Sequence, residues 1–319
     1  MGYLILILSL IGIVIGADQL VVGSVEIARR YKVSDFVIGA AIVGIGTSMP
    51  ELTVSFIGAL DGNSAVAIGN VVGSNIFNIL GILGLTALFF PVAVTKDNLR
   101  FEIPVCIGVS VLLTLLTFNP GDSGESVLNR SDGLILMIVF ACFMLFSLYR
   151  DRHIKRKAES DIQDFVNKPQ PPIWLSAIKV LGGLAILLVS CDLFVDKAVV
   201  LARKFGLSDA FISLTLIACG TSLPELAASI AAAVKKNTQL ALGNIVGSNI
   251  FNICLILGLC AQVHPLSTSS ITMTDYVLMV CAAVAILILG LFKGKIGRIS
   301  GLLMSMSYIG YTWYLLINQ

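Results

Sequence analysis

The chain has 319 residues, of which 57% are hydrophobic and only 13% are charged, and its mean hydropathy is +0.95. A soluble domain of this length could not bury so much apolar surface, so the composition predicts a polytopic membrane protein. The net charge of +2 and the scattering of basic residues between apolar runs exclude a nucleic-acid binder. The seven cysteines lie in or beside apolar runs without a CxxC pair, and we expect them to be packing residues.

Apolar runs bounded by charges, prolines or polar clusters predict an all-α fold with ten transmembrane helices. The predicted spans are residues 3–27, 35–60, 65–90, 101–118, 131–149, 173–198, 209–234, 239–262, 275–292 and 297–317. No Lys or Arg precedes the first run, which argues against a signal peptide. We therefore expect it to be a retained helix.

A polar stretch that ends in prolines, residues 150–172, divides the chain into a first half, residues 1–149, and a second half, residues 173–319. The predicted loops on the side of this linker hold 17 of the 21 Lys and Arg residues. Since basic loops remain in the cytoplasm, the pattern predicts a cytoplasmic linker and two external termini. We expect the cell (inner) membrane as the location, with the lipid bilayer and ions as partners and no soluble protein partner.

The two halves carry an internal repeat. Residues 34–78 align without a gap on residues 208–252 at an offset of 174, and 22 of the 45 positions are identical. Each half has five predicted spans, an odd number, so the second half must be inverted in the membrane relative to the first. The sequence therefore predicts two inverted-topology five-helix repeats with a substrate site near the midplane between them.

The repeated motifs place polar groups in the middle of apolar spans. In the first copy, Thr47, Ser48 and Glu51 share a helix face beside Pro50, and Asn70, Ser74 and Asn78 recur every four residues. The second copy repeats this pattern with the following residues: Thr221, Ser222, Glu225, Asn244, Ser248 and Asn252. A carboxylate inside a span is costly and indicates a functional site. The donors are all oxygens, which suits Ca²⁺, and two negative charges match one Ca²⁺, two Na⁺ or two protons.

Other interpretations of these residues exist. Ser48-Met49-Pro50-Glu51 also fits a capping box at a helix start, and the Gly/Asn/Ser stripes also suit helix packing. Asp18 and its counterpart Asp192 lie towards the ends of spans, where an interfacial or capping role is favoured over ion contact. A broken helix at membrane depth is tolerated only inside protein or beside a cavity, which favours the ion site for the two glutamates.

The doubled G-T-S-[LM]-P-E, each followed by G-N-x-V-G-S-N-I-F-N, resembles the alpha repeats of the calcium/cation antiporter superfamily, the sodium/calcium exchangers. The resemblance covers nearly the whole chain and is greatest to the short prokaryotic members. It implies the ten-span inverted fold and a shared role of Glu51 and Glu225 in binding Ca²⁺ and Na⁺. It further implies oxygen ligands from Thr47, Thr221, Gly44 and Ala218, sodium sites at Ser48, Ser74, Ser222 and Ser248, and a centre closed by Asn78 and Asn252.

The chain departs from the described exchangers at Asn252, where they carry an aspartate. The centre then has two carboxylates rather than three. We expect a secondary active antiporter that exchanges Ca²⁺ for Na⁺ by alternating access, with no permanently bound cofactor and no enzymatic activity. H⁺/Ca²⁺ exchange is the nearest alternative, because burial favours a protonated carboxyl. A cation channel is the alternative of another class.

Overall fold

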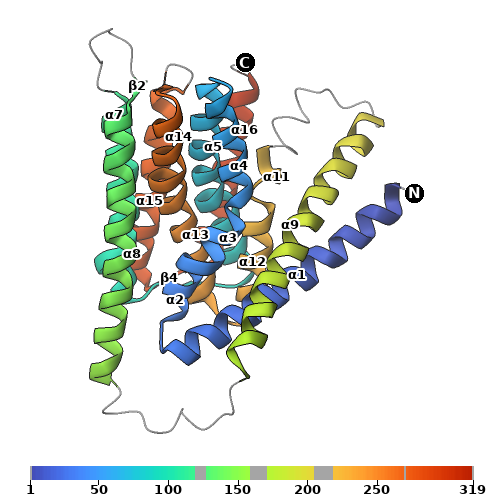
Figure 1. Ribbon diagram of the computed structural model, residues 1–319, viewed down its shortest axis with the longest axis vertical. Helices are drawn as coiled ribbons and strands as arrows, with labels where there is room; N and C mark the ends of the chain where they lie inside the picture. Colours follow the sequence, from blue (N-terminus) through green and yellow to red (C-terminus); the bar gives the residue numbers. More distant parts are fainter. Residues whose placement is uncertain (1, 119–126, 159–170, 205–217, 269–270, 318–319) are drawn as a thin grey trace.

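The computed structural model describes residues 2–118, 127–158, 171–204, 218–268 and 271–317. Nearly all described residues are helical, as the apolar composition predicts, because a chain in lipid must satisfy its backbone hydrogen bonds within itself. Figure 1 shows most helices side by side in a bundle, with the tilted α1 (Gly2–Tyr31) and α9 (Ile173–Lys204) lying together at its edge.

The first half follows α1 with a chain of short and long helices. These are α2 (Asp35–Ile38), the π-helix η1 (Gly39–Gly44), α3 (Ile45–Thr47), α4 (Met49–Leu60), α5 (Ser64–Ile76), the π-helix η2 (Phe77–Leu83), α6 (Gly84–Phe89), the π-helix η3 (Asn98–Glu102), α7 (Ile103–Thr117) and α8 (Arg130–Ala158). Helix α8 continues nine residues into the stretch that the sequence assigns to the linker, but the part of it that could span a membrane is Arg130–Arg150, which agrees with the predicted span 131–149.

The second half follows α9 with a similar order of elements. These are α11 (Ala218–Gly220), α12 (Leu223–Val234), α13 (Thr238–Phe251), the π-helix η5 (Asn252–Ile256), α14 (Leu257–Val263), α15 (Met273–Lys293) and α16 (Arg298–Ile317). Every residue from Leu240 to Phe251 is buried, so α13 lies in the centre of the bundle. The start of the predicted span 209–234 lies outside the described residues.

Seven helices of the described chain are long and apolar enough to cross a membrane, and the bent pair 35–47 and 49–60 makes an eighth. Leu223–Val234 is a shorter apolar helix. Large apolar side chains such as Leu145, Leu181 and Ile299 are exposed, as expected for surfaces that face lipid. The chain is thus an all-helical, multi-pass membrane protein, and the count of ten spans stays a prediction.

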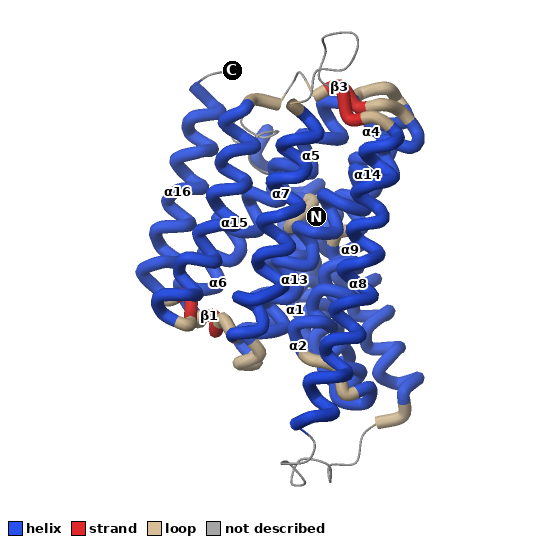
Figure 2. Tube along the Cα trace, turned by 90° about the vertical axis from the view of Figure 1, so that its left-hand side faces the viewer, coloured by secondary structure: helices blue, strands red, loops and turns tan. Residues whose placement is uncertain are grey.

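Two small antiparallel strand pairs, which the sequence pattern did not predict, join loops at opposite ends of the bundle (Figure 2). At one end, β1 (Val92–Ala93) pairs with β4 (Lys295–Ile296). At the other end, β2 (Val127–Leu128) pairs with β3 (Leu266–Ser267). Two-residue pairs satisfy a few backbone groups where helices stop, so their effect is to tie connections together.

Basic loops gather at the β1–β4 end of the bundle. Gln239 donates to the Ala93 carbonyl there, and the Arg150 guanidinium lies 3.0 Å from Asp97. Arg30 donates to the carbonyl of Pro171, near the end of the predicted linker. The loops to which the sequence assigns most of the positive charge therefore lie at one end of the molecule.

Helices α1 and α9 approach closely because glycines line their contact. A Cβ added at Gly16 would lie 2.6 Å from the Leu187 nitrogen, and one at Gly183 would lie 2.6 Å from the Leu20 nitrogen. Both distances are too short for a real side chain. The two helices can therefore lie backbone to backbone only with glycine at these positions.

Candidate functional site

Both repeats break their helix at the serine of the Thr-Ser pair. Ser48 has φ −82° and ψ 12°, and α2 to α3 is bent by 50° relative to α4. Ser222, its counterpart, has φ −90° and ψ 9°. A proline follows in the first turn of each new helix, where its missing N–H costs no helical hydrogen bond.

The capping-box interpretation of the break is wrong, because neither serine caps its own helix. The Ser48 hydroxyl instead donates to Glu225 Oε1 at 2.7 Å, and the Ser222 hydroxyl donates to Glu51 Oε1 at 2.7 Å. Each serine thus serves the carboxylate of the other repeat. All four side chains are fully buried, and the two carboxyls are close enough to interact electrostatically.

A reciprocal amide network lies beside these carboxylates. Asn75 and Asn249 each donate to the backbone carbonyl of the other, at 3.3 and 3.2 Å. Their side-chain oxygens then accept from Asn252 at 3.2 Å and from Asn78 at 3.0 Å, respectively. Because Asn78 and Asn252 use an amide N–H in these bonds, their side-chain orientation is set by the neighbouring asparagines.

Four oxygens of this centre have no hydrogen-bond partner although they are buried. They are Glu51 Oε2, Glu225 Oε2, Asn78 Oδ1 and Asn252 Oδ1. A buried acceptor without a donor is costly unless a cation or another ligand pairs with it. Two carboxylate and two amide oxygens form a hard donor set that fits Ca²⁺, and two ionised carboxylates would balance its charge.

The supporting bonds of the two copies match. Asn70 donates to the Glu51 carbonyl at 3.1 Å and to Ser55 at 2.9 Å. Asn244 donates to the Glu225 carbonyl at 3.2 Å and to Ser229 at 2.9 Å. These bonds hold the start of α4 and of α12 against α5 and α13. The broken helices are thereby fixed at the level of the carboxylates.

The remaining predicted site residues lie around this centre with different partners. The Thr47 hydroxyl is 3.3 Å from Asn244 Oδ1 and 3.4 Å from the Gly44 carbonyl, which also accepts from Ser248 at 3.3 Å. Thr221 has a buried hydroxyl without a partner. Ser74 is buried on α5, and Ala218 begins α11.

Sequence reasoning missed the role of Asn75 and Asn249 as the pair that orients the other two asparagines. Both belong to the repeated G-N-x-V-G-S-N-I-F-N motif, but they fall off the four-residue stripe. Their recurrence in both copies was the available signal. Asp18, for which the sequence favoured an interfacial or capping role, pairs with Lys235 at 2.6 Å.

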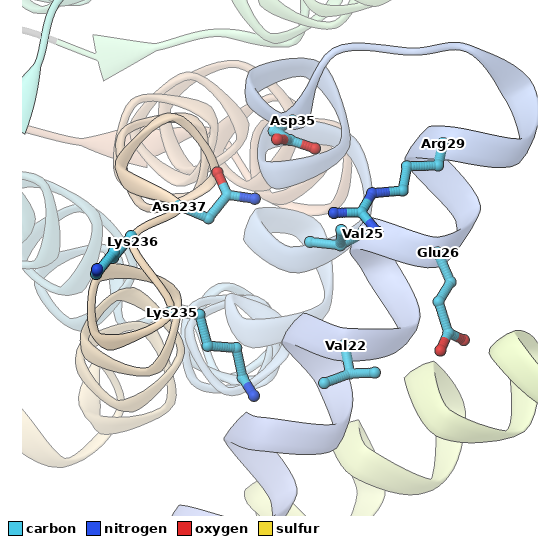
Figure 3. A pocket seen from close by; sticks show the side chains of 8 residues that line it. All are labelled: Val22, Val25, Glu26, Arg29, Asp35, Lys235, Lys236 and Asn237. Atoms are coloured by element: carbon cyan, nitrogen blue, oxygen red, sulfur yellow. The ribbon is translucent and has the colours of Figure 1, made fainter. Parts of the chain in front are cut away.

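A separate pocket of about 460 Å³ opens at the basic end of the molecule (Figure 3). Its lining comes from α1, α2 and the turn between α12 and α13: Val22, Val25, Glu26, Arg29, Asp35, Lys235, Lys236 and Asn237. None of these residues belongs to the oxygen-lined centre. In the described chain, no group of three or more His, Cys, Asp or Glu side chains gathers as a conventional metal cluster.

Paired carboxylates and broken helices at the buried centre of a multi-pass protein are typical of membrane cation transporters. The sodium/calcium exchanger protein family matches residues 1–149 and 175–317, and the chain belongs to that family. It is therefore a cation antiporter of the calcium-exchanging class, as the sequence resemblance predicted. Four of the seven cysteines are buried, as expected for packing residues, whereas Cys142 and Cys281 are exposed.

Relatives and solved structures agree with this membership. The chain is 38% identical over 318 residues to the putative antiporter CaxA of Alkalimonas amylolytica, covering 97% of this chain and 98% of that protein. It is 31% identical to the sodium/calcium exchanger MaX1 of Methanosarcina acetivorans, with 97% of each covered. A structure of the sodium-calcium exchanger NCX_Mj superposes with a TM-score of 0.83 at 32% identity, covering 98% of both chains.

Proposed function

We propose that this antiporter exchanges Ca²⁺ for Na⁺ at the centre formed by Glu51 and Glu225. The observation that carries the proposal is the set of four buried oxygens without donors, two of them from carboxylates. Na⁺ and Ca²⁺ both bind oxygen, and they would compete for the same carboxylates. Such competition is what couples the two fluxes, since the site cannot hold both loads together.

Further ligands come from the breaks and the polar stripes. Thr47, Thr221, Gly44 and Ala218 supply hydroxyl or carbonyl oxygens next to the glutamates. Ser48, Ser74, Ser222 and Ser248 supply sodium positions towards the two faces, and Asn78 and Asn252 close the centre. No resident cofactor takes part, and the protein is a transporter rather than an enzyme.

The fold in the membrane is ten transmembrane helices in two inverted five-helix repeats, residues 1–149 and 173–319, joined by the linker 150–172. Supporting this arrangement, bonds of the first repeat recur in the second at equivalent positions, such as Asn70 to Ser55 and Asn244 to Ser229. Alternating access would then exchange the conformations of two halves that meet at one site.

In this proposal the protein lies in the cell (inner) membrane with its linker in the cytoplasm and both termini outside. The gathering of basic loops at the β1–β4 end supports this orientation. A relative covering 82% of this chain at 38% identity is the inner membrane protein YrbG of Escherichia coli.

The test is transport of ⁴⁵Ca²⁺ into proteoliposomes with Na⁺ and pH gradients imposed separately. An outward Na⁺ gradient at constant pH should drive uptake that saturates and stops when Na⁺ is absent from the far side. Uptake driven only by a pH gradient would establish the H⁺/Ca²⁺ alternative. Flux that needs no counter-ion would identify a channel.

Glu51→Gln and Glu225→Gln should each reduce exchange at least about 100-fold, because removing one partner of a buried charged set costs roughly 3–5 kcal/mol. Glu102→Gln is the matched control. Glu102 is also a buried carboxyl, but it lies 3.6 Å from Arg150 at the basic end. Near-normal Na⁺-dependent uptake by either central variant would refute the site.

A further inference from the structure

The pocket at the basic end of the molecule has a lining that suits an anion. Arg29 comes from the last turn of α1, and Lys235 and Lys236 come from the turn between α12 and α13. Figure 3 shows α1 on one side of the pocket and this turn on the other. Positive charge on both walls repels Ca²⁺ and Na⁺, so the pocket is unsuited to the transported cations.

The carboxylates near the pocket cancel only part of this charge. Glu26 pairs with Lys179, and Asp18 lies 2.6 Å from Lys235. Asp35 begins α2, where the positive end of the helix stabilises a carboxylate. When the partners Lys179 and Asp18 are counted, the pocket gathers four basic and three acidic side chains, so one positive charge is left over.

Two basic side chains of the lining have no counter-charge. Arg29 and Lys236 form no ion pair with any residue that the structure describes. Lys236 also has a left-handed backbone with φ of 61°, and its equivalent in the other repeat is Gly62 with φ of 71°. Glycine adopts this conformation at lower cost, so a lysine here indicates a role for the side chain rather than for the turn.

A neutral donor with a fixed orientation lies between these cations. Asn237 caps α13, and its side-chain oxygen accepts from the Leu240 nitrogen at 3.1 Å. Because the cap uses the oxygen, the amide N–H groups are left free, and Figure 3 shows Asn237 and Arg29 extending towards each other across the pocket. A guanidinium, an amide and the positive end of a long helix are groups that bind phosphate.

Apolar surface adjoins these donors. Two valines of α1 line the pocket, and Val234, directly before the basic turn, is 57% exposed. A phospholipid carries one negative charge on its phosphodiester beside apolar acyl chains, and basic pockets at the ends of membrane helices bind such head groups. We propose that this pocket binds the phosphodiester group of a membrane lipid, with Arg29, Lys236 and Asn237 as its donors.

Calorimetric titration of the full-length protein in an uncharged detergent tests the ligand class. Dioctanoyl phosphatidylglycerol is the probe, dioctanoylglycerol lacks the phosphate, and glycerophosphoglycerol lacks the acyl chains. The probe should bind at least about 10-fold more tightly than either comparison compound, since charged and apolar contacts both contribute. Equal affinity for dioctanoylglycerol would overturn the phosphate site, and equal affinity for glycerophosphoglycerol would overturn its assignment to a lipid.

A change at the helix cap tests the amide donor. Asn237→Asp keeps an acceptor for the cap but replaces the N–H donors with a negative charge, so the Kd of the probe should rise at least about 10-fold. Asn63→Asp is the matched control, because Asn63 makes the same cap in the equivalent turn of the other repeat, where it accepts from Val66. Its Kd should stay within about 2-fold of the unaltered protein.

The two unpaired cations are tested separately. Arg29→Gln and Lys236→Gly should each raise the Kd of the probe at least about 10-fold, since a charge-assisted hydrogen bond is lost. Lys236→Gly places the residue of the equivalent turn in the left-handed position, so this variant should fold at least as well as the unaltered protein. Arg30→Gln is the control, because Arg30 donates to the Pro171 carbonyl and does not line the pocket. Unchanged affinity in the Lys236 and Asn237 variants would overturn the site.

Discussion

At the scale of residues, the centre is built from bonds that cross between the repeats. Ser48 and Ser222 exchange carboxylate partners, and Asn75 and Asn249 exchange backbone partners. The glutamates could be predicted from sequence because a carboxylate within an apolar run is costly and therefore indicates a function. The crossed serines could not, because a local cap and a contact across the molecule use the same hydroxyl and the same spacing.

The asparagine network gives a prediction about a pair that binds no ion directly. Asn75→Ala and Asn249→Ala each leave a buried amide unpaired, which costs about 1–3 kcal/mol. We expect the Ca²⁺ half-saturation concentration to rise by roughly 5- to 150-fold in both variants, since Asn252 or Asn78 loses its orientation. Concentration-dependent ⁴⁵Ca²⁺ uptake measures it.

An asparagine outside the network supplies the control for that experiment. Asn63 carries the same amide but caps α5 at the exposed end of the helix, where its side chain accepts from the Val66 nitrogen. Asn63→Asp keeps an acceptor there and should leave the half-saturation within about 2-fold. Equal Ca²⁺ affinities of the unaltered protein and the Asn75 and Asn249 variants would contradict an orienting role.

At the scale of elements, π-helices begin at or beside the residues that close the centre. Asn78 is the second residue of η2, and Asn252 is the first residue of η5. Such wide turns are frequent at functional sites because they redirect a side chain out of the regular helical pattern. Apolar length predicted where the helices lie, but a π-turn changes the helical period without interrupting the apolar run, so these segments left no clear sequence signal.

Some of the close helix contacts could be predicted from the sequence, and others could not. The glycines of the G-N-x-V-G motif were predicted to permit close packing, and Gly243 and Gly247 lie directly against Phe36 and Ala40. The equivalent neighbours of Gly69 and Gly73 fall in residues 205–217 by the repeat offset, outside the described residues. Gly16 and Gly183 carried no motif, so their contact emerged only from the structure.

The α1–α9 contact leads to a prediction from two adjacent glycines. Gly183→Ala places a Cβ against the Leu20 backbone and should destabilise the protein by about 1–3 kcal/mol. At Gly182 an added Cβ meets no atom of the described chain within 4 Å. Gly182→Ala should therefore be neutral or stabilise by up to about 1 kcal/mol, because alanine favours helix.

Thermal unfolding of the two variants in the same detergent measures the difference. Equal melting temperatures would show that α1 and α9 do not pack as described. Because the two positions are neighbours on one helix, expression, detergent binding and helix propensity are matched between them.

At the scale of the whole molecule, the two repeats differ in charge at one pair of equivalent turns. The turn Asp61-Gly62-Asn63 aligns with Lys235-Lys236-Asn237. Gly62 and Lys236 have the same left-handed backbone, with φ of 71° and 61°. A lysine in this conformation is less favourable than glycine. The positive charge of Lys236 at the basic end therefore costs about 1 kcal/mol of folding stability.

These equivalent turns provide a test of orientation. In a variant without the seven native cysteines, Asp61→Cys should react with a membrane-impermeant maleimide in intact cells. Lys235→Cys should react only after the membrane is permeabilised, because the positive end faces the cytoplasm. Labelling of Lys235→Cys in intact cells together with protection of Asp61→Cys would reverse the orientation. Both positions are exposed in the structure, so access within the protein is matched.

The crossed serine–glutamate pairs have an implication for the origin of the chain. Each carboxylate receives its hydroxyl from the other half, so a single half contains every residue type of the centre but cannot assemble one. Two copies of one half, inserted in opposite directions, would reproduce both pairs. The present gene is what fusion of such an antiparallel homodimer would leave, with divergence in the turns and identity retained at the shared axis.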